Sequence, residues 1–358
     1  MATHSLEAII SEITPPDAQC MAQAQAHTAQ LVMPTRALGR LHEIGERLCA
    51  IQGTLTPSIT QKAVLIMAAD HGVAASGVSA YPQEVTGAMV QTFLAGGAGI
   101  NAIANQVGAT VRVVDMGIIP ELDPAHMPNG AALRVSKIGR GTANFCKGPA
   151  MERPAAEASV LAGYRYAAEM INEGIRIIGT GDMGIGNTTP STAIGSVLTG
   201  KSPAVMVGPG TGIDKNRMVA KRDIVEQAIR VNQPRADDGL DVLAKVGGFE
   251  IGGIAGIILA AAHHRCPVVI DGFISSAGAL VAQALCPPAL EYAFAGHCSE
   301  EPGHRHMLDH LNLRPILDLG MRLGEGTGAA LAMSVIEAAS RITKEVMTFD
   351  EAGVAGKS

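Results

Sequence analysis

The chain has 358 residues, of which 47% are hydrophobic and only 17% are charged, and its formal net charge is -6. It is long enough for a large α/β domain with a smaller appendage, and much of it must lie in a core. Aromatic residues make up 3% of the chain and Trp is absent. A net acidic chain with so few aromatics lacks the stacking platforms and basic grooves of nucleic-acid binders, which argues against nucleic acid as a partner.

The cellular compartment is suggested by three further features. The N-terminus shows no basic segment followed by an apolar one, so we expect no signal peptide. The longest apolar stretch, residues 252–262, is too short and too rich in glycine to cross a bilayer. The six scattered cysteines include no Cys-x-x-Cys pair and are expected to be reduced thiols. We therefore expect a cytoplasmic protein without membrane contact.

The N-terminal segment predicts helices. The sequence Pro15-Pro16-Asp17 is a helix start signal, and residues 18–32 follow with good helix formers and no glycine. Residues 38–51 carry apolar side chains at helical spacing and predict a second helix. Residues 53–57 then break the pattern and lead into the main part of the chain.

Short apolar runs, each ending in Gly or Asp and followed by a helical segment, dominate the middle of the chain. They span residues 63–69, 110–115, 175–179, 204–207 and 267–271. This alternation is typical of repeated βα units in a parallel sheet, where ligands bind outside the carboxyl ends of the strands. The sequence therefore predicts an α/β fold, with a Rossmann-like parallel sheet and helices on both faces.

The C-terminal stretch 328–347 is again helical in pattern. We expect it to pack with the N-terminal helices, so that residues 1–60 and 328–358 form a small helical domain from both chain termini. Residues 61–327 would then be the Rossmann-like α/β catalytic domain. The tail 348–358 is expected to fray.

A glycine-rich stretch after one predicted strand is a candidate phosphate site. It contains Gly179, Gly181, Gly184 and Gly186, and then Asn187, Thr188 and Thr189 before a helix expected near Pro190. Glycine lets backbone N–H groups approach a phosphate closely, and a helix N-terminus favours an anion. The alternative is a tight turn with a Thr cap. The hydroxyls and the amide beside four glycines favour phosphate.

A second glycine turn, residues 208–214, is followed by several basic residues: Lys215, Arg217, Lys221 and Arg222. Most of these cations are expected to form a solvated helix face. One of them is a candidate for contact with a phosphate held at the two glycine turns.

One carboxylate is set between glycines directly before the C-terminal helix, in the sequence Leu323-Gly-Glu-Gly-Thr-Gly328. Glu325 could be an acid that interacts with the helix dipole. It could also be a general base, because an apolar pocket would raise its pKa towards neutrality.

Histidines invite a metal interpretation at Asp70-His71 and again over residues 297–310. Their spacing matches neither His-Glu-x-x-His nor a paired-cysteine scheme. We therefore expect no metal, and no cofactor.

Seven motifs in fixed order, in register from about residue 10 to about residue 345, resemble the nicotinate-nucleotide–dimethylbenzimidazole phosphoribosyltransferase family. They are Ala69–Val73, Tyr81–Thr86, Asp115–Ile118, Gly184–Pro190, Lys245–Phe249, Asp271–Phe273 and Arg322–Gly326. The resemblance implies a homodimer that acts on nicotinate mononucleotide and a benzimidazole-type base, with Glu325 as catalytic base. It implies that phosphate and ribose lie at Gly181, Asp182, Gly184, Gly186, Asn187, Thr188, Gly208, Gly210 and Lys221. It places the base at Tyr81, Met89, Met183 and Leu323.

The chain departs from the family pattern at some of these positions. Asp182 stands where many members have Glu, so a contact with ribose or base would be longer or bridged by water. Tyr81 and Met89 stand where some relatives have small or polar residues, which bears on the preferred base. Residues 33–40 also differ from the usual pattern.

Two other functions stay open at this point. A nicotinamide-dependent oxidoreductase would use the Gly-x-Gly-x-x-Gly pattern at residues 179–184, but it needs an acid about 20 positions later, and residues 202–206 contain none. A catalytically silent nucleotide-binding protein on the same fold would not need Glu325.

Overall fold

The computed structural model describes residues 5–210, 212 and 214–355. Its centre is a six-stranded sheet in the order β3-β2-β1-β4-β5-β6, in which every neighbouring pair is parallel. The strands are β1 (Lys62–Ala69), β2 (Ala109–Gly117), β3 (Leu133–Val135), β4 (Ile177–Met183), β5 (Val268–Ile270) and β6 (Ala293–Ala295). The strand order reverses between β1 and β4, and at such a point a crevice opens at the carboxyl ends of the strands.

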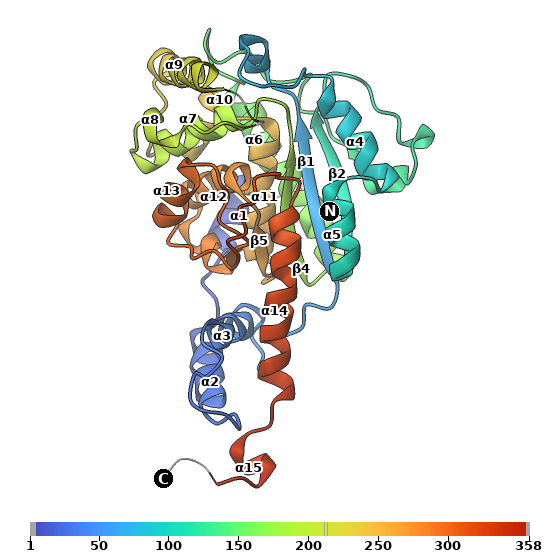
Figure 1. Cartoon of the computed structure of the whole chain (residues 1–358), viewed down its shortest axis with the longest axis vertical. Coiled ribbons are helices and arrows are strands. Elements are labelled where there is room, and N and C mark those ends of the chain that lie inside the picture. Colours follow the sequence, from blue (N-terminus) through green and yellow to red (C-terminus); the bar gives the residue numbers. More distant parts are fainter. Residues whose placement is uncertain (1–4, 211, 213, 356–358) are drawn as a thin grey trace.

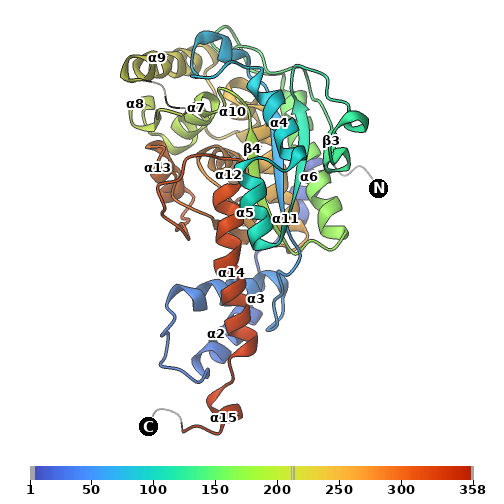
Figure 2. The same cartoon turned by 45° about the vertical axis from the view of Figure 1, so that its right-hand side comes forward.

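Helices cover both faces of the sheet, as predicted (Figures 1 and 2). Gly253 of α11 (Phe249–His263) packs against Met67 of β1, whereas Gly326, which precedes α14 (Thr327–Glu345), packs against Val64 of the same strand. Side chains at odd and even positions of a strand point to opposite faces, so α11 and α14 lie on opposite sides of the sheet. The predicted Rossmann-like α/β fold is confirmed.

The remaining helices connect or flank these elements. The α-helices are α1 (Leu6–Glu12), α2 (Ala18–Ala29), α3 (Arg40–Gln52), α4 (Val85–Ala95), α5 (Gly99–Val107), α6 (Arg153–Asn172), α7 (Thr188–Thr199), α8 (Pro203–Met206), α9 (Lys215–Asn232), α10 (Gly239–Val246), α12 (Phe273–Leu285), α13 (Gly303–His310) and α15 (Phe349–Ala352). Short 3-10 turns are η1 (Gly72–Ser76), η2 (Pro124–His126), η3 (Gly130–Ala132) and η4 (Pro287–Tyr292).

Some predicted elements were wrong in type or extent. Residues 204–207 do not form a strand: Pro203 starts the short helix α8, because its fixed φ suits the first helical position. The strand expected at 175–179 is β4, which begins later and runs on to Met183. Helix α7 begins at Thr188, two residues before the start that was expected near Pro190. The three-residue strands β3 and β6 were not predicted at all.

Helices from the N-terminal and C-terminal parts of the chain, α2, α3 and the last turns of α14, lie together at the end of the molecule away from the carboxyl ends of the strands (Figure 1). Gly45 of α3 fits closely against Thr343 of α14, and His27 of α2 bonds through Nε2 to the Thr343 carbonyl at 3.0 Å. The division into domains at residues 60/61 and 327/328 stays a prediction. The fraying expected for residues 348–358 is wrong for 349–352, which form α15 with a capping box; residues 356–358 lie outside the described part.

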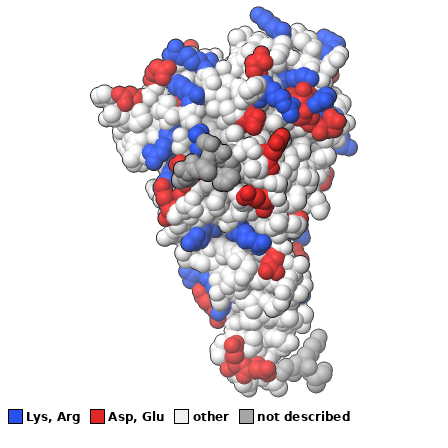
Figure 3. Space-filling view, turned by 180° about the vertical axis from the view of Figure 1, so that it is seen from behind, with Lys and Arg blue, Asp and Glu red and all other residues white. Residues whose placement is uncertain are grey.

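Within the described residues, no helix is both long enough and apolar enough to cross a membrane. On the face drawn in Figure 3, basic and acidic side chains are interspersed over a mostly uncharged surface. The described residues on this face therefore do not form the continuous basic surface that would attract a polyanion.

Candidate active site

A cavity of about 680 Å³ opens at the carboxyl end of β4, where the sheet order reverses. Its wall combines residues from distant parts of the sequence. Most predicted site residues line it: Tyr81, Met89, Asp182, Met183, Gly184, Asn187, Thr188, Gly210, Leu323 and Glu325. The sequence did not single out the other wall residues Val85, Ile185, Ile274, Glu301 and Arg322 as site residues. Gly181, Gly186, Gly208 and Lys221 are not part of the wall.

Glu325 sits in a turn whose backbone is unusual. Its φ is +63°, and the flanking Gly324 and Gly326 have φ values of +83° and +88°. Three successive left-handed residues are tolerated because two of them lack a side chain, and the strain of the third is typical of functional sites. Gly181 packs directly against this turn, and a larger residue would not fit there, since a Cβ at position 181 would lie 2.7 Å from the Glu325 carbonyl oxygen.

The Glu325 carboxylate points into the protein and not into bulk water. The residue is 5% exposed, and its Oε2 accepts a hydrogen bond from the Ile100 N–H of α5 at 3.1 Å. Burial raises the pKa of Glu325 above its ordinary value, the Ile100 N–H partly opposes this, and the nearby Asp271 raises it further. A carboxylate of this kind is a better proton acceptor than one in water.

Asp271, at the end of β5, fixes the Glu325 turn. Its Oδ2 accepts from the Gly326 N–H at 3.2 Å and its Oδ1 from the Ala329 N–H at 2.9 Å. These are N–H groups at the start of α14 that have no partner within the helix. The backbone of the catalytic candidate is therefore anchored by a second carboxylate, whose own pKa is raised by burial.

Asp182 lies next to Glu325 in the same wall. It is 6% exposed and accepts a hydrogen bond from Asn187 Nδ2 at 3.0 Å. Burial, and then the charge of Asp271, raise its pKa well above the ordinary value. No Lys, Arg or His among the described residues forms an ion pair with Asp182 or Glu325. This end of the cavity therefore raises the pKa of two carboxyls without an ion-pair partner among the described residues.

A buried cation marks the other end of the cavity. Lys221 of α9 is 1% exposed, and its Nζ donates to Thr188 Oγ1 at 2.8 Å and to the Gly208 carbonyl at 3.2 Å. Burial lowers the pKa of Lys221 to about 8, although Glu301 acts in the opposite direction. Among the described basic side chains of residues 215–222, Lys221 is thus the cation that the structure brings to the glycine loops. Arg322 of the wall also reaches them and donates to the Gly210 carbonyl at 3.4 Å.

Glu301 is a wall residue that the sequence placed only in a histidine-rich cluster. Its Oε1 accepts from the Gly210 N–H at 2.8 Å, and its Oε2 is buried without a hydrogen-bond partner among the described residues. Burial raises the pKa of Glu301, and Lys221 opposes this. A buried acid beside a candidate phosphate loop has no separate signature in the sequence.

The apolar part of the wall lies at the cavity mouth. Tyr81 is 56% exposed and Leu323 is 60% exposed, whereas Met89 and Met183 are half-buried beside them. An apolar planar ring could be covered by these side chains while its edge reaches Glu325. The residues that were expected to hold a base are therefore grouped, next to the candidate proton acceptor.

Two of the histidines that invited a metal interpretation, His71 and His304, have hydrogen-bond partners of other kinds. His71 and Glu250 are fully buried, and a hydrogen bond of 2.8 Å joins His71 Nε2 and Glu250 Oε1. His304 bonds through Nε2 to Ser276 and accepts at Nδ1 from the Ser299 N–H, and burial lowers its pKa to about 3. Within the described chain, no group of three or more His, Cys, Asp or Glu side chains could hold a metal ion.

The Gly-x-Gly-x-x-Gly pattern does not have the geometry of a dinucleotide fingerprint. Gly179 and Gly181 lie inside strand β4, where they pack against α14 and the Glu325 turn. In a dinucleotide site these glycines would form the turn after the strand. Their role here is close packing.

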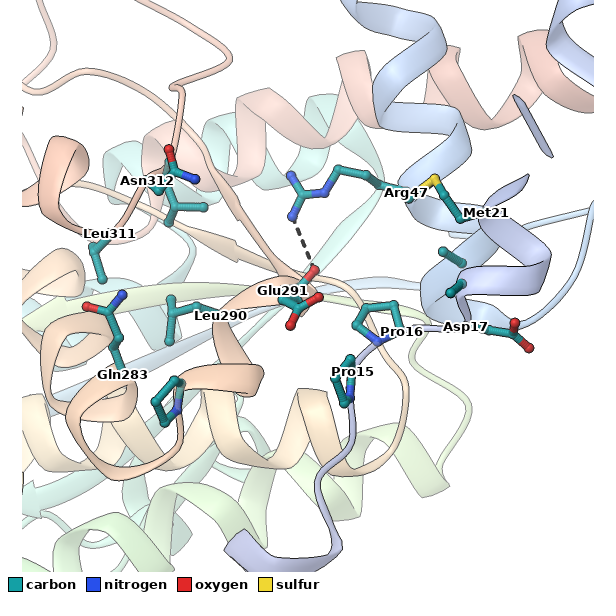
Figure 4. Close-up of a pocket in the computed structure, with 14 residues that line it drawn as sticks. Pro15, Pro16, Asp17, Met21, Arg47, Gln283, Leu290, Glu291, Leu311 and Asn312 are labelled. Atoms are coloured by element: carbon teal, nitrogen blue, oxygen red, sulfur yellow. Dashed lines mark hydrogen bonds between the residues drawn. The ribbon is translucent and has the colours of Figure 1, made fainter. Parts of the chain in front are cut away.

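A second cavity, of about 600 Å³, lies between residues 15–21 and the η4 region (Figure 4). Arg47 spans its rim, donating to the carbonyls of Glu291 and Ala293, and its guanidinium stacks over the Phe294 ring. It contains none of the predicted site residues.

Comparison with known proteins agrees with this geometry. A family model described as phosphoribosyltransferase matches residues 13–354. The chain is 53% identical over 345 residues to nicotinate-nucleotide–dimethylbenzimidazole phosphoribosyltransferase of Geobacter metallireducens, covering 96% of each chain. It is 51% identical to that of Geotalea uraniireducens, covering 98% of each.

A solved structure from Thermus thermophilus, described as the same enzyme, superposes with a TM-score of 0.89 at 46% identity, covering 95% of this chain and 100% of that one. A second structure, described as CobT from the same organism, gives a TM-score of 0.90. These matches extend over nearly the whole length of both partners. The chain is therefore an enzyme that belongs to the nicotinate-nucleotide–dimethylbenzimidazole phosphoribosyltransferase family.

Proposed function

We propose that this enzyme moves the 5-phosphoribosyl group of nicotinate mononucleotide onto 5,6-dimethylbenzimidazole or a related base. The products would be α-ribazole 5'-phosphate and nicotinate, in the assembly of the cobalamin nucleotide loop. The observation that carries this proposal is the buried Glu325 carboxylate, which shares one cavity with an apolar wall and with Thr188, the hydrogen-bond partner of Lys221. The printed names of the relatives point to the same reaction.

The chemistry needs one proton acceptor. Nicotinate leaves a ribosyl pyridinium as a neutral ring nitrogen, so its departure requires no general acid. One nitrogen of the incoming benzimidazole forms the new bond to the anomeric carbon as the bond to nicotinate breaks. The proton on the other nitrogen passes to Glu325. Attack from the opposite face turns the β-linked donor into an α-linked product, and a nearby carboxylate favours the cationic sugar in the transition state.

Other residues of the wall and of the loops next to it would bind and orient the donor. Thr188 begins α7, whose N-terminus favours an anion, and the Gly210 N–H and Lys221 lie beside it. We assign the phosphate to this end, with Gly184, Gly186 and Gly208 shaping the loops. Asp182 and Asn187, which bond to each other, are assigned to the ribose. Holding the ribose in place would supply much of the rate by orientation.

The test is to incubate the enzyme with nicotinate mononucleotide and a panel of benzimidazoles and purines. We expect mass detection of an α-ribotide together with an equal amount of nicotinate. Absence of both with every base would contradict the proposal, and hydride transfer from NADH would revive an oxidoreductase. The panel also identifies the preferred base, on which Tyr81 and Met89 bear.

We also propose, from the family resemblance, that the enzyme is a cytoplasmic homodimer with the two domains described above. The exposed Tyr81 and Leu323 beside the cavity are apolar surfaces that a second subunit could cover. Light scattering of the purified protein would give the mass in solution, and a monomer at working concentration would contradict this part of the proposal.

A further inference from the structure

One end of the cavity is already occupied by a side chain of the protein itself. Glu301 follows β6, is 4% exposed, and accepts the Gly210 N–H at 2.8 Å through Oε1. Its Oε2 packs so closely against Gly208 that a Cβ added at this glycine would collide with it. The Glu301 carboxylate thus occupies the space beside Gly208 and Gly210, at the place where the proposed function puts a phosphate.

The charges at this end are arranged around the same carboxylate. Lys221 donates two of its three ammonium N–H groups, to Thr188 and to the Gly208 carbonyl. The third N–H has no hydrogen-bond acceptor among the described residues. Glu301 and Lys221 each favour the charged form of the other, and Arg322 acts on Glu301 in the same direction. The second carboxylate oxygen, Oε2, is buried without a hydrogen-bond partner in the described part of the chain. A buried polar atom without a partner destabilises the folded state, so its presence needs an explanation.

A phosphate at this end would need the groups that Glu301 now uses. The Gly210 N–H can serve one acceptor well, and Lys221 is the buried cation that faces it. Two anions in contact repel strongly where water is scarce. The carboxylate must therefore move, or the phosphate must bind against its charge.

We propose that Glu301 is an internal anion, which holds the Gly208–Gly210 turn and balances Lys221 in the empty enzyme and competes with the incoming phosphate. It would lower the affinity for phosphorylated ligands while leaving unphosphorylated ones unaffected. Release of product, which carries the same phosphate, would benefit from this competition. The inference rests on the proposed function only in placing a phosphate at this end.

A second effect of Glu301 has the opposite sign, because its charge also keeps Lys221 protonated. The pKa of Lys221 is about 8, so at pH 7 the amine is mostly charged in the wild type. A bound phosphate would itself supply the negative charge that keeps the amine protonated in the complex. Loss of the repulsion is then the larger effect of removing the Glu301 charge.

The experiment is calorimetric titration of the Glu301→Gln variant at pH 7 with nicotinate mononucleotide, nicotinate riboside and inorganic phosphate. Glutamine retains an oxygen for the Gly210 N–H and nearly the same shape. We expect nicotinate mononucleotide and phosphate to bind about tenfold more tightly than to the wild type, an effect equivalent to about one pKa unit of charge interaction. Affinity for the riboside should not change.

The matched control is Glu300→Gln. Glu300 is the neighbouring residue and is exposed, so this variant loses the same charge from nearly the same place. Its affinity for all three ligands should equal that of the wild type. An equal gain in both variants would make the effect one of net charge, and would overturn the specific role of Glu301.

Phosphate affinity in Glu301→Gln that is equal to or lower than the wild-type value also overturns the proposal; a lower value would make Glu301 a supporter of Lys221. Should Glu301→Gln fail to fold, Glu301→Asp tests the competition for the Gly210 N–H alone, because its shorter carboxylate withdraws from Gly210 but keeps the charge; a smaller gain in phosphate affinity is then expected, and no gain overturns the proposal. Failure of phosphate to bind to either protein removes the phosphate assignment and this inference together. Selective tightening without any transfer to benzimidazoles contradicts only the proposed function.

Discussion

The two ends of the candidate active-site cavity bury ionisable groups in different surroundings. Asp182 and Glu325 lie beside each other without a cation, and burial raises the pKa of both. Lys221 lies beside a carboxylate, Glu301, and its pKa falls only to about 8. Burial at this unpaired end raises the pKa of a candidate proton acceptor, whereas at the Lys221 end the charge of Glu301, without a direct ion pair, favours the protonated amine. Each prediction below changes one side of this contrast.

The largest effect is expected at the unpaired end. Glu325→Gln keeps the size of the side chain and its contact with the Ile100 N–H but removes the proton acceptor, so kcat should fall by about 10²–10⁴-fold. Steady-state formation of the α-ribotide measures this, with Glu300→Gln as a control of equal charge. Unchanged turnover would show that Glu325 is not the base.

At the Lys221 end, Lys221→Met keeps an unbranched side chain of similar length and removes the charge. Loss of charge-assisted hydrogen bonds to phosphate should raise KM for nicotinate mononucleotide by about 10–100-fold, with a smaller change in kcat. Arg222→Met, at the next position of α9 and partly exposed to solvent, is the control. If KM stays at the wild-type value, the phosphate lies elsewhere.

The pH profile separates the two ends further. Glu325 can accept a proton only when it is deprotonated, and burial raises its pKa in the folded enzyme. We therefore expect kcat to begin to fall with decreasing pH while the pH is still above 4.5, the ordinary pKa of Glu. Below the raised pKa, each further pH unit should lower kcat about tenfold. The acidic limb should vanish from the residual activity of Glu325→Gln. A limb at or below pH 4.5 contradicts the raised pKa.

The smallest effect concerns stability. The pKa of Asp182 is higher in the folded than in the unfolded state. Protonated Asp182 therefore contributes stability at pH values below its unfolded-state pKa, and this contribution is lost as the pH rises through its folded-state pKa. Asp182→Asn should therefore increase the free energy of unfolding at pH 7 by about 1 kcal/mol, which is about 1–3 °C in Tm. Differential scanning calorimetry measures this, with the exposed Asp237→Asn as control. A lower Tm for Asp182→Asn alone would mean that the ionised form is stabilised.

Long apolar runs made much of the fold predictable. The run 63–69 became β1, whose eight residues are all buried, because a central parallel strand is covered on both faces. Strands β3 and β6 have three residues each and leave no periodic pattern to detect. Residues 204–207 resembled a strand in composition, but Pro203 set the backbone to a helical turn.

The site was predictable where one segment contained the signal. Glycines on both sides of Glu325, and glycines around Asp182, are visible within a few residues. The partners that define their chemistry are remote: Ile100 lies 225 positions from Glu325, and Glu301 lies 91 positions from Gly210. No local pattern predicts such contacts, so the raised pKa of Glu325 and the carboxylate beside Lys221 emerged only from the three-dimensional arrangement.

Helix α14 has two sets of neighbours that constrain its length. Its first turns pack against Gly179 and follow the Glu325 turn, while Thr343 near its end packs against Gly45 of α3. Each residue of an α-helix turns the chain by about 100°. Deleting a single residue from the middle of α14 would therefore rotate one contact surface away from its partner, so this helix should tolerate substitution far better than any change in length.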